Sequence, residues 1–367
     1  MTQFNIIGTF LGCSGYDRHT RGLINALHKV SKVRLSCGLI QGWERIVNDK
    51  ELEMMKTKPT EDEINLIITS PVHWRTYATA KQNWVYCVWE GDKVPKFFIE
   101  EMCNPEIEYI LVPSTHTRDA IVRTLHETPT IFGDMIPNEL NDIIIHKIKL
   151  VPHGVDTNLF YPKEKPKRLT FLCVKGFRNL EDRGGMQYCL KAYLEEFTDK
   201  EDVELKLLIN PAYGIPNLDQ MIRALTNKKN NLPSLIIDTN AYKYEDMVNI
   251  YNSANVLIMP SRAEAYGLPG IEAMACGLPV TTTNFGGQTD YVNSDNGWLV
   301  GGELIEVKHE IQYEGIKWLT PDIIELRKIL REIYENPEKA RQKGCNGLKT
   351  ALLNTWGESA NKLMKLV

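Results

Sequence analysis

Two carboxylates, Glu264 and Glu272, flank a predicted junction between a loop and a helix, with seven residues between them. The preceding run, Val256–Met259, is apolar, which predicts a buried strand. Pro269 and Gly277 are the residue types that favour the first helical position and the position just past a helix end. A second apolar run follows Gly277 directly. Strand, loop, helix and strand in this order place the loop at the carboxyl end of a parallel strand, where open α/β sheets bind ligands.

The chemistry that this stretch can supply is the recognition of hydroxyls and phosphates. A carboxylate accepts two hydroxyl hydrogen bonds at once, and such charge-assisted bonds are about twice as strong as neutral ones. Backbone N–H groups ahead of a helix favour a pyrophosphate, because the helix dipole and the unpaired first-turn amides both attract an anion. Four consecutive residues would present these groups: Ala265, Tyr266, Gly267 and Leu268. The stretch therefore predicts a site for a nucleotide-sugar.

The composition indicates a two-domain globular protein without a nucleic-acid partner. With 367 residues the chain exceeds one ordinary core and suits two domains of similar size. Its net charge of −4 provides no general attraction for nucleic acid. The eight cysteines are scattered without a Cys-x-x-Cys pair, which is typical of reduced, buried thiols. Because Met1 leads directly into a strand and no apolar run approaches about 18 residues, we expect no signal peptide, no membrane span and a cytoplasmic location.

Alternating strand and helix patterns predict an α/β protein with mostly parallel sheets. The predicted strands are 4–10, 33–39, 64–68, 84–89, 109–112, 148–151, 169–174, 203–209, 234–237, 256–259, 278–281 and 297–300. The proline- and charge-rich residues 161–168 predict a linker between two domains, 1–160 and 169–345. Apolar residues at helical spacing in 346–367 predict a terminal helix that packs back onto the protein rather than onto a membrane.

Motifs along most of the chain resemble one enzyme family. The strongest is PSRAEAYGLPGIEAMACGLPV at residues 260–280, which contains Glu264 and Glu272. Supporting motifs are VPSTHTR at 112–118, VPHGVD at 151–156 and YEDM at 244–247. Together they resemble the retaining nucleotide-sugar glycosyltransferases of the GT-B fold, in the large group with the paired-glutamate pattern E-x7-E. That group includes sucrose synthase and the bacterial mannosyl- and glucosyltransferases.

The resemblance implies a fold of two Rossmann-like domains with parallel sheets facing across a cleft. The second domain would hold most of the donor, and the C-terminal helix would cross back to the first domain. In the family the second glutamate of the pair binds the ribose hydroxyls, and the first lies beside the donor sugar. Carried over to this sequence, those roles fall to Glu272 and Glu264 respectively.

The resemblance also implies two cations for the pyrophosphate, placed after the first strand of the second domain. Arg183 occupies the place of the usual lysine. The usual Gly-Arg is absent from this sequence, so the other cation is either Arg178 or Lys175. An arginine offers a bidentate fork where a lysine offers a point charge, so Arg183 suits a phosphate.

The first domain would supply the acceptor side of the site. Gly12 and Gly15 belong to a loop that approaches the donor phosphates in the family. Glu90 follows a predicted strand at a place where many relatives have histidine, and it would orient or deprotonate an acceptor hydroxyl. His73, at the end of another predicted strand, is the second candidate for that role.

The expected activity is a retaining transfer of a hexose from a UDP- or GDP-linked sugar to a hydroxyl acceptor. The acceptor class is a glycan, a lipid-linked molecule or a small molecule, and peripheral membrane contact stays open. No Asp-x-Asp motif lies near a strand end, so we expect no metal and no other cofactor. The alternatives are a nucleotide-sugar epimerase, a phosphorylase that carries pyridoxal phosphate, and a non-catalytic nucleotide-sugar-binding protein. The charge balance disfavours a DNA-modifying transferase.

Overall fold

The computed structural model describes residues 2–12, 14–37, 47–127, 130–131, 134–135, 138–177, 181–211, 217–226, 231–308 and 311–367. The chain divides into two compact units, called here the first unit and the second unit. The first unit comprises Met1–Gly154, Val307–Lys317 and Asn354–Val367, and the second comprises Val155–Glu306 and Trp318–Leu353. The main boundary therefore follows Gly154 instead of residue 160. Segment Val307–Lys317 belongs to the first unit although the chain on either side of it belongs to the second.

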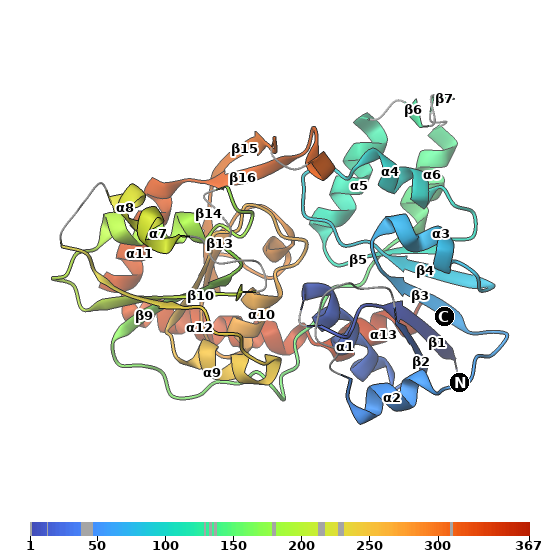
Figure 1. Cartoon of the computed structure of the whole chain (residues 1–367), viewed down its shortest axis with the longest axis horizontal. Helices are drawn as coiled ribbons and strands as arrows, with labels where there is room; N and C mark the ends of the chain where they lie inside the picture. The colour runs from blue at the N-terminus through green and yellow to red at the C-terminus, as the bar shows by residue number, and fades with distance from the viewer. Residues whose placement is uncertain are drawn as a thin grey trace. The chain divides into compact units, whose positions relative to one another are not determined.

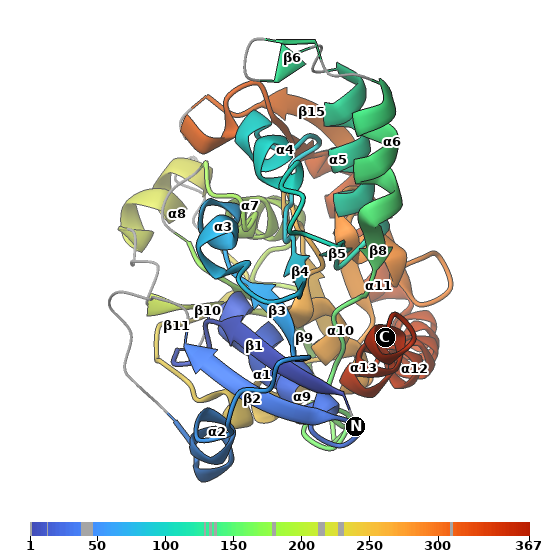
Figure 2. The same cartoon turned by 90° about the vertical axis from the view of Figure 1, so that its right-hand side faces the viewer.

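A parallel six-stranded sheet forms the centre of the first unit, in the order β2-β1-β3-β4-β5-β8. Its strands are β1 (Gln3–Gly8), β2 (Lys32–Cys37), β3 (Ile64–Ile68), β4 (Gln82–Tyr86), β5 (Tyr109–Val112) and β8 (Ile148–Leu150). The helices are α1 (Gly15–Leu27), α2 (Asp49–Met55), η1 (Pro71–His73), α3 (Trp74–Tyr77), α4 (Lys96–Met102), α5 (Thr115–Glu127), α6 (Asn138–Lys147), η5 (Ile311–Tyr313) and α13 (Trp356–Met364). A short hairpin joins β6 (Thr130–Ile131) to β7 (Asp134–Met135). Helices α1 and α13 lie on one face of the sheet and α3, α4, α5 and α6 on the other (Figure 1), and Figure 2 shows β1 to β5 side by side.

The second unit has its own parallel six-stranded sheet, in the order β11-β10-β9-β12-β13-β14. Its strands are β9 (Leu169–Lys175), β10 (Val203–Ile209), β11 (Ser234–Asp238), β12 (Val256–Met259), β13 (Val280–Thr283) and β14 (Gly297–Val300). The helices are α7 (Met186–Glu196), α8 (Leu218–Thr226), η3 (Tyr244–Asp246), α9 (Met247–Asn252), α10 (Leu268–Ala275), η4 (Gly287–Asp290), α11 (Ile323–Glu335) and α12 (Pro337–Leu353). A two-stranded sheet pairs β15 (Gly302–Glu306) with β16 (Lys317–Pro321). Helices α7, α8 and α11 cover one face of the large sheet, and α9, α10 and α12 cover the other (Figure 1).

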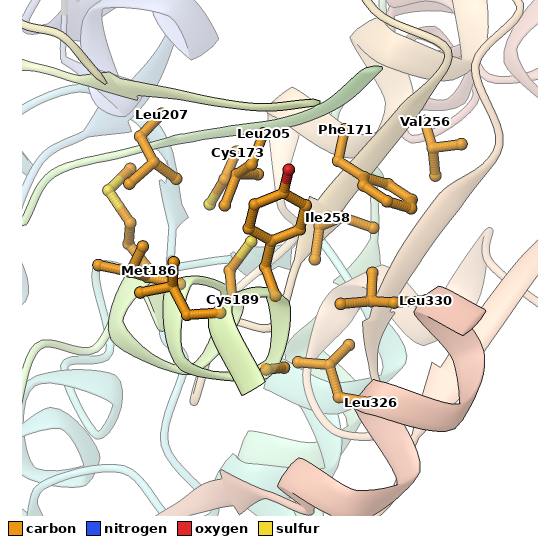
Figure 3. Close-up of a cluster of buried hydrophobic side chains, with 14 of the residues drawn as sticks. Phe171, Cys173, Met186, Cys189, Leu205, Leu207, Val256, Ile258, Leu326 and Leu330 are labelled. Carbon is orange, nitrogen blue, oxygen red and sulfur yellow. The ribbon is translucent and has the colours of Figure 1, made fainter. Parts of the chain in front are cut away.

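A cluster of buried apolar side chains joins β9, β10 and β12 to α7 and α11 (Figure 3). Phe171, Leu205 and Ile258 point from the strands, and Met186 and Leu330 meet them from the helices. Fully burying one such side chain stabilises the fold by about 1.5–3 kcal/mol. This core holds the carboxyl ends of β9 and β12, from which the donor-side residues project.

All twelve predicted strands are present in the two large sheets, and their described ends differ from the predicted ones by a few residues at most. The predicted end of the second strand, at 38–39, lies outside the described residues. Apolar runs located the strands well because strands of a parallel sheet are buried on both faces. The short β6–β7 and β15–β16 pairs have no such continuous apolar run, and the sequence did not predict them.

Residues 161–168, predicted as the linker, are held by the second unit. The Asn252 side chain accepts hydrogen bonds from the Lys163 backbone N–H at 2.7 Å and from Lys165 Nζ at 2.6 Å. It also donates to the carbonyl of Tyr161 at 3.0 Å. Most side chains of this segment are exposed, which accounts for its polar composition. The segment is therefore solvated at its surface and fixed through its backbone.

The predicted C-terminal helix is interrupted. Helix α12 ends at Leu353, and Thr355 caps α13 by accepting the Glu358 N–H at 3.3 Å. The predicted apolar face divides at this break, because Leu353 is 75% exposed whereas Trp356 is buried. The prediction of one continuous helical face is therefore wrong, since the cap starts a new helix within it.

Trp356 is part of the first unit and packs closely against other residues of that unit. A Cβ at Gly22 would lie 2.2 Å from the Trp356 ring, and a Cβ at Gly154 would lie 2.2 Å from the Trp356 backbone nitrogen. Two buried imidazoles, His19 and His153, lie beside this ring with their own centroids 4.1 Å apart. Burial lowers the pKa of His153 to about 3. Burial and the neighbouring His153 lower the pKa of His19 well below its usual value.

Candidate functional site

The strand order of the second unit reverses between β9 and β12, which creates a topological switch point in its sheet. Ligands of open α/β sheets bind at the carboxyl ends of the strands that flank such a point. Lys175 is the last residue of β9, and Glu264 lies in the loop that follows β12. The predicted strand, loop, helix and strand are present as β12, the loop 260–267, α10 and β13.

Glu264 is held between two cations. Lys175 Nζ donates to Glu264 Oε1 at 2.5 Å, and both side chains are largely buried. Burial alone would raise the pKa of Glu264, but the charges of Lys175 and Arg183 and the hydrogen bond from Lys175 hold it below its usual value. The carboxylate is therefore ionised at neutral pH. Two cations therefore act on one carboxylate here.

Arg183 reaches this group because its loop packs tightly on the end of β12. Its Nη1 donates to the Ala263 carbonyl at 2.8 Å, and its own carbonyl accepts the Arg262 N–H at 2.9 Å. Gly185 follows in the left-handed conformation, with φ of 78°. A Cβ there would lie 1.9 Å from the Pro260 carbonyl oxygen, so only glycine allows this approach. The role predicted for Arg183, binding the donor pyrophosphate, stays a prediction.

Helix α10 begins without a side-chain cap among the described residues. Its N-cap is Gly267, in the left-handed conformation with φ of 83°. The Tyr291 hydroxyl fixes this turn by donating to the Gly267 carbonyl at 2.6 Å. The backbone of Ala265, Tyr266, Gly267 and Leu268 thus leads into the positive end of the helix, as predicted for an anion-binding turn.

Glu272 lies inside α10 and is fully buried. The Tyr244 hydroxyl donates to its Oε1 at 2.9 Å, and the Tyr251 hydroxyl donates to its Oε2 at 2.7 Å. The Phe160 ring packs edge-on against both tyrosines. The sequence prediction did not include these tyrosines. Their spacing of seven residues across a predicted helix is a signal that places them on one face.

Glu90, predicted to lie on the acceptor side, is in the loop after β4 of the first unit. The Tyr313 hydroxyl donates to Glu90 Oε1 at 2.6 Å, and His116 Nε2 donates to the Glu90 carbonyl at 2.9 Å. Burial raises the pKa of Tyr16, and so do the nearby Cys87 and Glu90. The loop after β1, the end of β4 and the start of α5 therefore meet around Glu90. They are carboxyl ends of parallel strands, where the predicted site belongs.

The glycine loop after β1 is organised by Asp17. Its carboxylate accepts the N–H groups of Gly12 at 2.9 Å and of Ser14 at 3.0 Å. Ser14 and Asp17 form a capping box at the start of α1, and the spacing Ser-x-x-Asp is its sequence signal. Gly15 has open space where a Cβ would stand. In this structure the Gly12 N–H donates to the Asp17 carboxylate. The predicted approach of Gly12 to a phosphate therefore requires that the N–H leave Asp17 and donate to the phosphate instead.

Two other predicted residues fall outside these groups. His73 ends η1 with an exposed side chain, and its described ring contact is with Tyr77, at 6.5 Å between centroids. Among the contacts described for His73, none involves Glu90. Arg178 lies outside the described residues. Lys175, the other alternative for the first cation, donates to Glu264.

Neither a metal-binding cluster nor a membrane-spanning helix occurs in the described part of the chain. No group of three or more His, Cys, Asp or Glu side chains there could hold a metal ion. Within the same residues, no helix combines the length and apolar character that crossing a bilayer requires. Metal independence stays a prediction.

The family described as "Glycosyl transferases group 1" matches residues 162–347 of the chain. One relative is the MMP alpha-(1->4)-mannosyltransferase of Mycolicibacterium hassiacum, which is 25% identical over 235 residues. That stretch covers 63% of this chain and 51% of the relative. The chain spans about half the length of the curated relatives it matches.

Two solved structures share the fold over the whole chain. Sucrose-phosphate synthase from Thermosynechococcus elongatus has a TM-score of 0.67 and 17% identity, covering 100% of this chain and 98% of that one. A glycosyltransferase from Rickettsia africae has a TM-score of 0.68 and 14% identity, covering 100% and 97%. With two parallel six-stranded sheets, the predicted GT-B class of two Rossmann-like domains is confirmed. Because the family match at 162–347 extends over half of the chain, the protein belongs to the glycosyl transferases group 1 family.

Proposed function

We propose that the protein transfers a hexosyl group from a UDP- or GDP-linked sugar to a hydroxyl acceptor, with retention of the anomeric configuration. The observation that carries the proposal is the largely buried Glu264, ionised between Lys175 and Arg183 and ahead of the start of α10, which has no side-chain cap among the described residues. A carboxylate, two cations and a helix N-terminus close together suit a sugar joined to a diphosphate.

The donor would be bound by groups of different chemistry. Arg183, Lys175 and the first-turn amides of α10 would meet the diphosphate, whose charge of about two is otherwise unbalanced in a dry site. Glu272 would accept the ribose hydroxyls, because a carboxylate oxygen has more than one acceptor position. Tyr244 and Tyr251 hold that carboxylate in one orientation before the donor arrives. Glu264 would lie by the hexose.

The transfer exchanges one bond at the anomeric carbon. The bond from that carbon to the diphosphate oxygen breaks with its electron pair, and the acceptor oxygen bonds to the same face. The acceptor proton goes to the departing diphosphate, and Glu90 orients the hydroxyl by accepting a hydrogen bond from it. The cations Lys175 and Arg183 would stabilise the developing charge on the diphosphate, so no metal is required in this proposal.

The test is a panel of UDP- and GDP-hexoses offered with hydroxyl acceptors and followed by mass spectrometry. We expect one donor to yield free nucleoside diphosphate and a glycosylated acceptor, with equal rates in EDTA. Conversion of the donor without any acceptor would favour an epimerase. Donor binding without transfer or hydrolysis would favour a non-catalytic binding protein.

Replacing Arg183 with glutamine should weaken binding of free UDP or GDP by about tenfold, because a hydrogen bond to a charged group contributes about 1.5–3 kcal/mol. Isothermal titration at fixed ionic strength measures the change, and Arg183→Lys should recover part of the affinity. Arg341→Gln is the matched control, because Arg341 is an exposed arginine that pairs with Glu338. An Arg183→Gln protein that binds the diphosphate as tightly as the parent would remove this contact from the proposal.

A further inference from the structure

The segment Val307–Lys317 brings a tyrosine to the acceptor-side carboxylate. It connects β15 to β16 of the second unit, yet it is part of the first unit. Its Tyr313 hydroxyl donates to Glu90 Oε1 at 2.6 Å, across 223 positions of sequence. A hydrogen bond from a hydroxyl to a carboxylate is short and about twice as strong as a neutral one. No pattern in the sequence connects these two residues.

Two hydrogen bonds and a close contact hold the segment against the loop that carries Glu90. The Lys317 N–H donates to Asp92 Oδ1 at 2.7 Å, and the Asp92 N–H donates to the Lys317 carbonyl at 3.3 Å. Between them, a Cβ at Gly91 would lie 2.4 Å from Ile316 Cγ2. Gly91 is therefore in direct contact with Ile316 of the segment, and Asp92 forms two hydrogen bonds with Lys317.

The Tyr313 ring has a defined place as well. It stacks on Trp89, with centroids 4.9 Å apart and planes at 27°, and both side chains are buried. Trp89 is itself tied down, because its Nε1 donates to the Lys93 carbonyl at 2.5 Å and its carbonyl accepts from Thr117 Oγ1 at 2.8 Å. Stacking fixes the ring, and the fixed ring aims the hydroxyl at Glu90.

We propose that Tyr313 is a positioning residue that holds the Glu90 carboxylate in the orientation used for the acceptor hydroxyl. The inference rests on the proposed function, in which Glu90 orients that hydroxyl. A carboxylate without this bond gains rotamer freedom, and a misplacement of about 1 Å at a reacting group costs up to about 100-fold in rate. The loss should appear in acceptor use and not in donor affinity, because the Tyr313 hydroxyl bonds to the carboxylate that the proposal assigns to the acceptor.

The experiment compares Tyr313→Phe with the parent protein. The variant keeps the ring on Trp89 and removes only the hydroxyl. We expect kcat/KM for the acceptor to fall about tenfold, in line with the contribution of a hydrogen bond to a charged group. We expect the Kd for UDP or GDP to be unchanged, and Tm to fall by no more than a few degrees, because one hydrogen bond is lost. The matched control is Tyr242→Phe, which removes another 2.6 Å bond from a tyrosine to a carboxylate, that of exposed Tyr242 to Asp238, and should leave the kinetics unchanged.

A double-mutant cycle with Glu90→Gln separates the inference from its premise. If Tyr313 acts through Glu90, Tyr313→Phe should cost less than about twofold in the Glu90→Gln background, because coupled residues are not additive. An equal loss in both backgrounds, or no loss in the parent, would overturn the positioning role while leaving the proposed function intact. A Glu90→Gln protein with full transfer activity would remove Glu90 from the reaction and the inference with it. Absence of transfer by the parent with every donor would defeat the proposed function itself.

Discussion

Replacement of Glu272 by glutamine is expected to weaken the binding of UDP or GDP by about 10- to 100-fold, because hydrogen bonds to a charged group contribute about 1.5–3 kcal/mol. Glu272 is fully buried, and both of its oxygens accept tyrosine hydroxyls. Glutamine preserves the shape and still pairs with Tyr244 and Tyr251, whereas alanine would leave both hydroxyls unpaired in the core. The loss then reports on the ligand more than on the fold. Isothermal titration with matched Tm measurements would show it.

If Glu272 binds the ribose, its substitution should change the preference for the ribonucleotide as well as weaken binding. The parent should prefer UDP or GDP over the 2′,3′-dideoxy analogue, and Glu272→Gln should bind the two alike. The matched control is Tyr251→Phe, which removes one donor but keeps the carboxylate, so most of the ribose preference should persist. If Glu272→Gln retains the full preference for the ribonucleotide, the carboxylate is structural and the ribose contact lies elsewhere.

Acidification from pH 7 to pH 5 is expected to lower the free energy of unfolding by about 2 kcal/mol for each of His19 and His153, from linkage to an unfolded pKa of about 6.5. Burial keeps both imidazoles neutral in the folded protein, with the pKa of His153 at about 3 and that of His19 well below its usual value. The folded pKa is the lower one, so the unfolded chain binds more protons as the pH falls. The loss begins near pH 6.5 and, for His153, is complete near pH 3.

The measurement is urea denaturation at both pH values, followed by tryptophan fluorescence, since Trp356 packs beside the two rings. His19→Phe should recover about 2 kcal/mol of the loss, because a phenyl ring does not take up a proton. Neither nitrogen of His19 has a hydrogen-bond partner among the described residues, so this change removes no described bond. His28→Gln, at an exposed position just past the same helix, should leave the pH dependence unchanged. An identical drop in His19→Phe and the parent would contradict the assignment.

Local signals were sufficient for the strands and for the donor loop. The central strands are short apolar runs buried on both faces, which the sequence shows directly. The edge strands β8 and β11 are less buried, but the sequence located them as well. Pro269 and Gly277 marked the bounds of α10 because their backbone preferences act within a single turn. Glu264 and Glu272 were identified in the same way, from their positions relative to a strand and a helix that the local pattern predicts.

Contacts between distant segments had to come from the tertiary structure. Lys175 meets Glu264 across 89 positions, whereas the sequence favoured Arg178 over Lys175 as the first cation. The Tyr313 bond to Glu90 and the membership of segment Val307–Lys317 in the first unit left no local trace. The apolar spacing of the C-terminal residues continues across the break before Trp356, so the spacing did not reveal the break. In the structure the Thr355 cap and the close packing of Trp356 against Gly22 and Gly154 mark it. The sequence determined which elements form, since that depends on neighbours within a few residues. Which side chains those elements bring together depends on packing between residues far apart in the chain, and only the fold decides that.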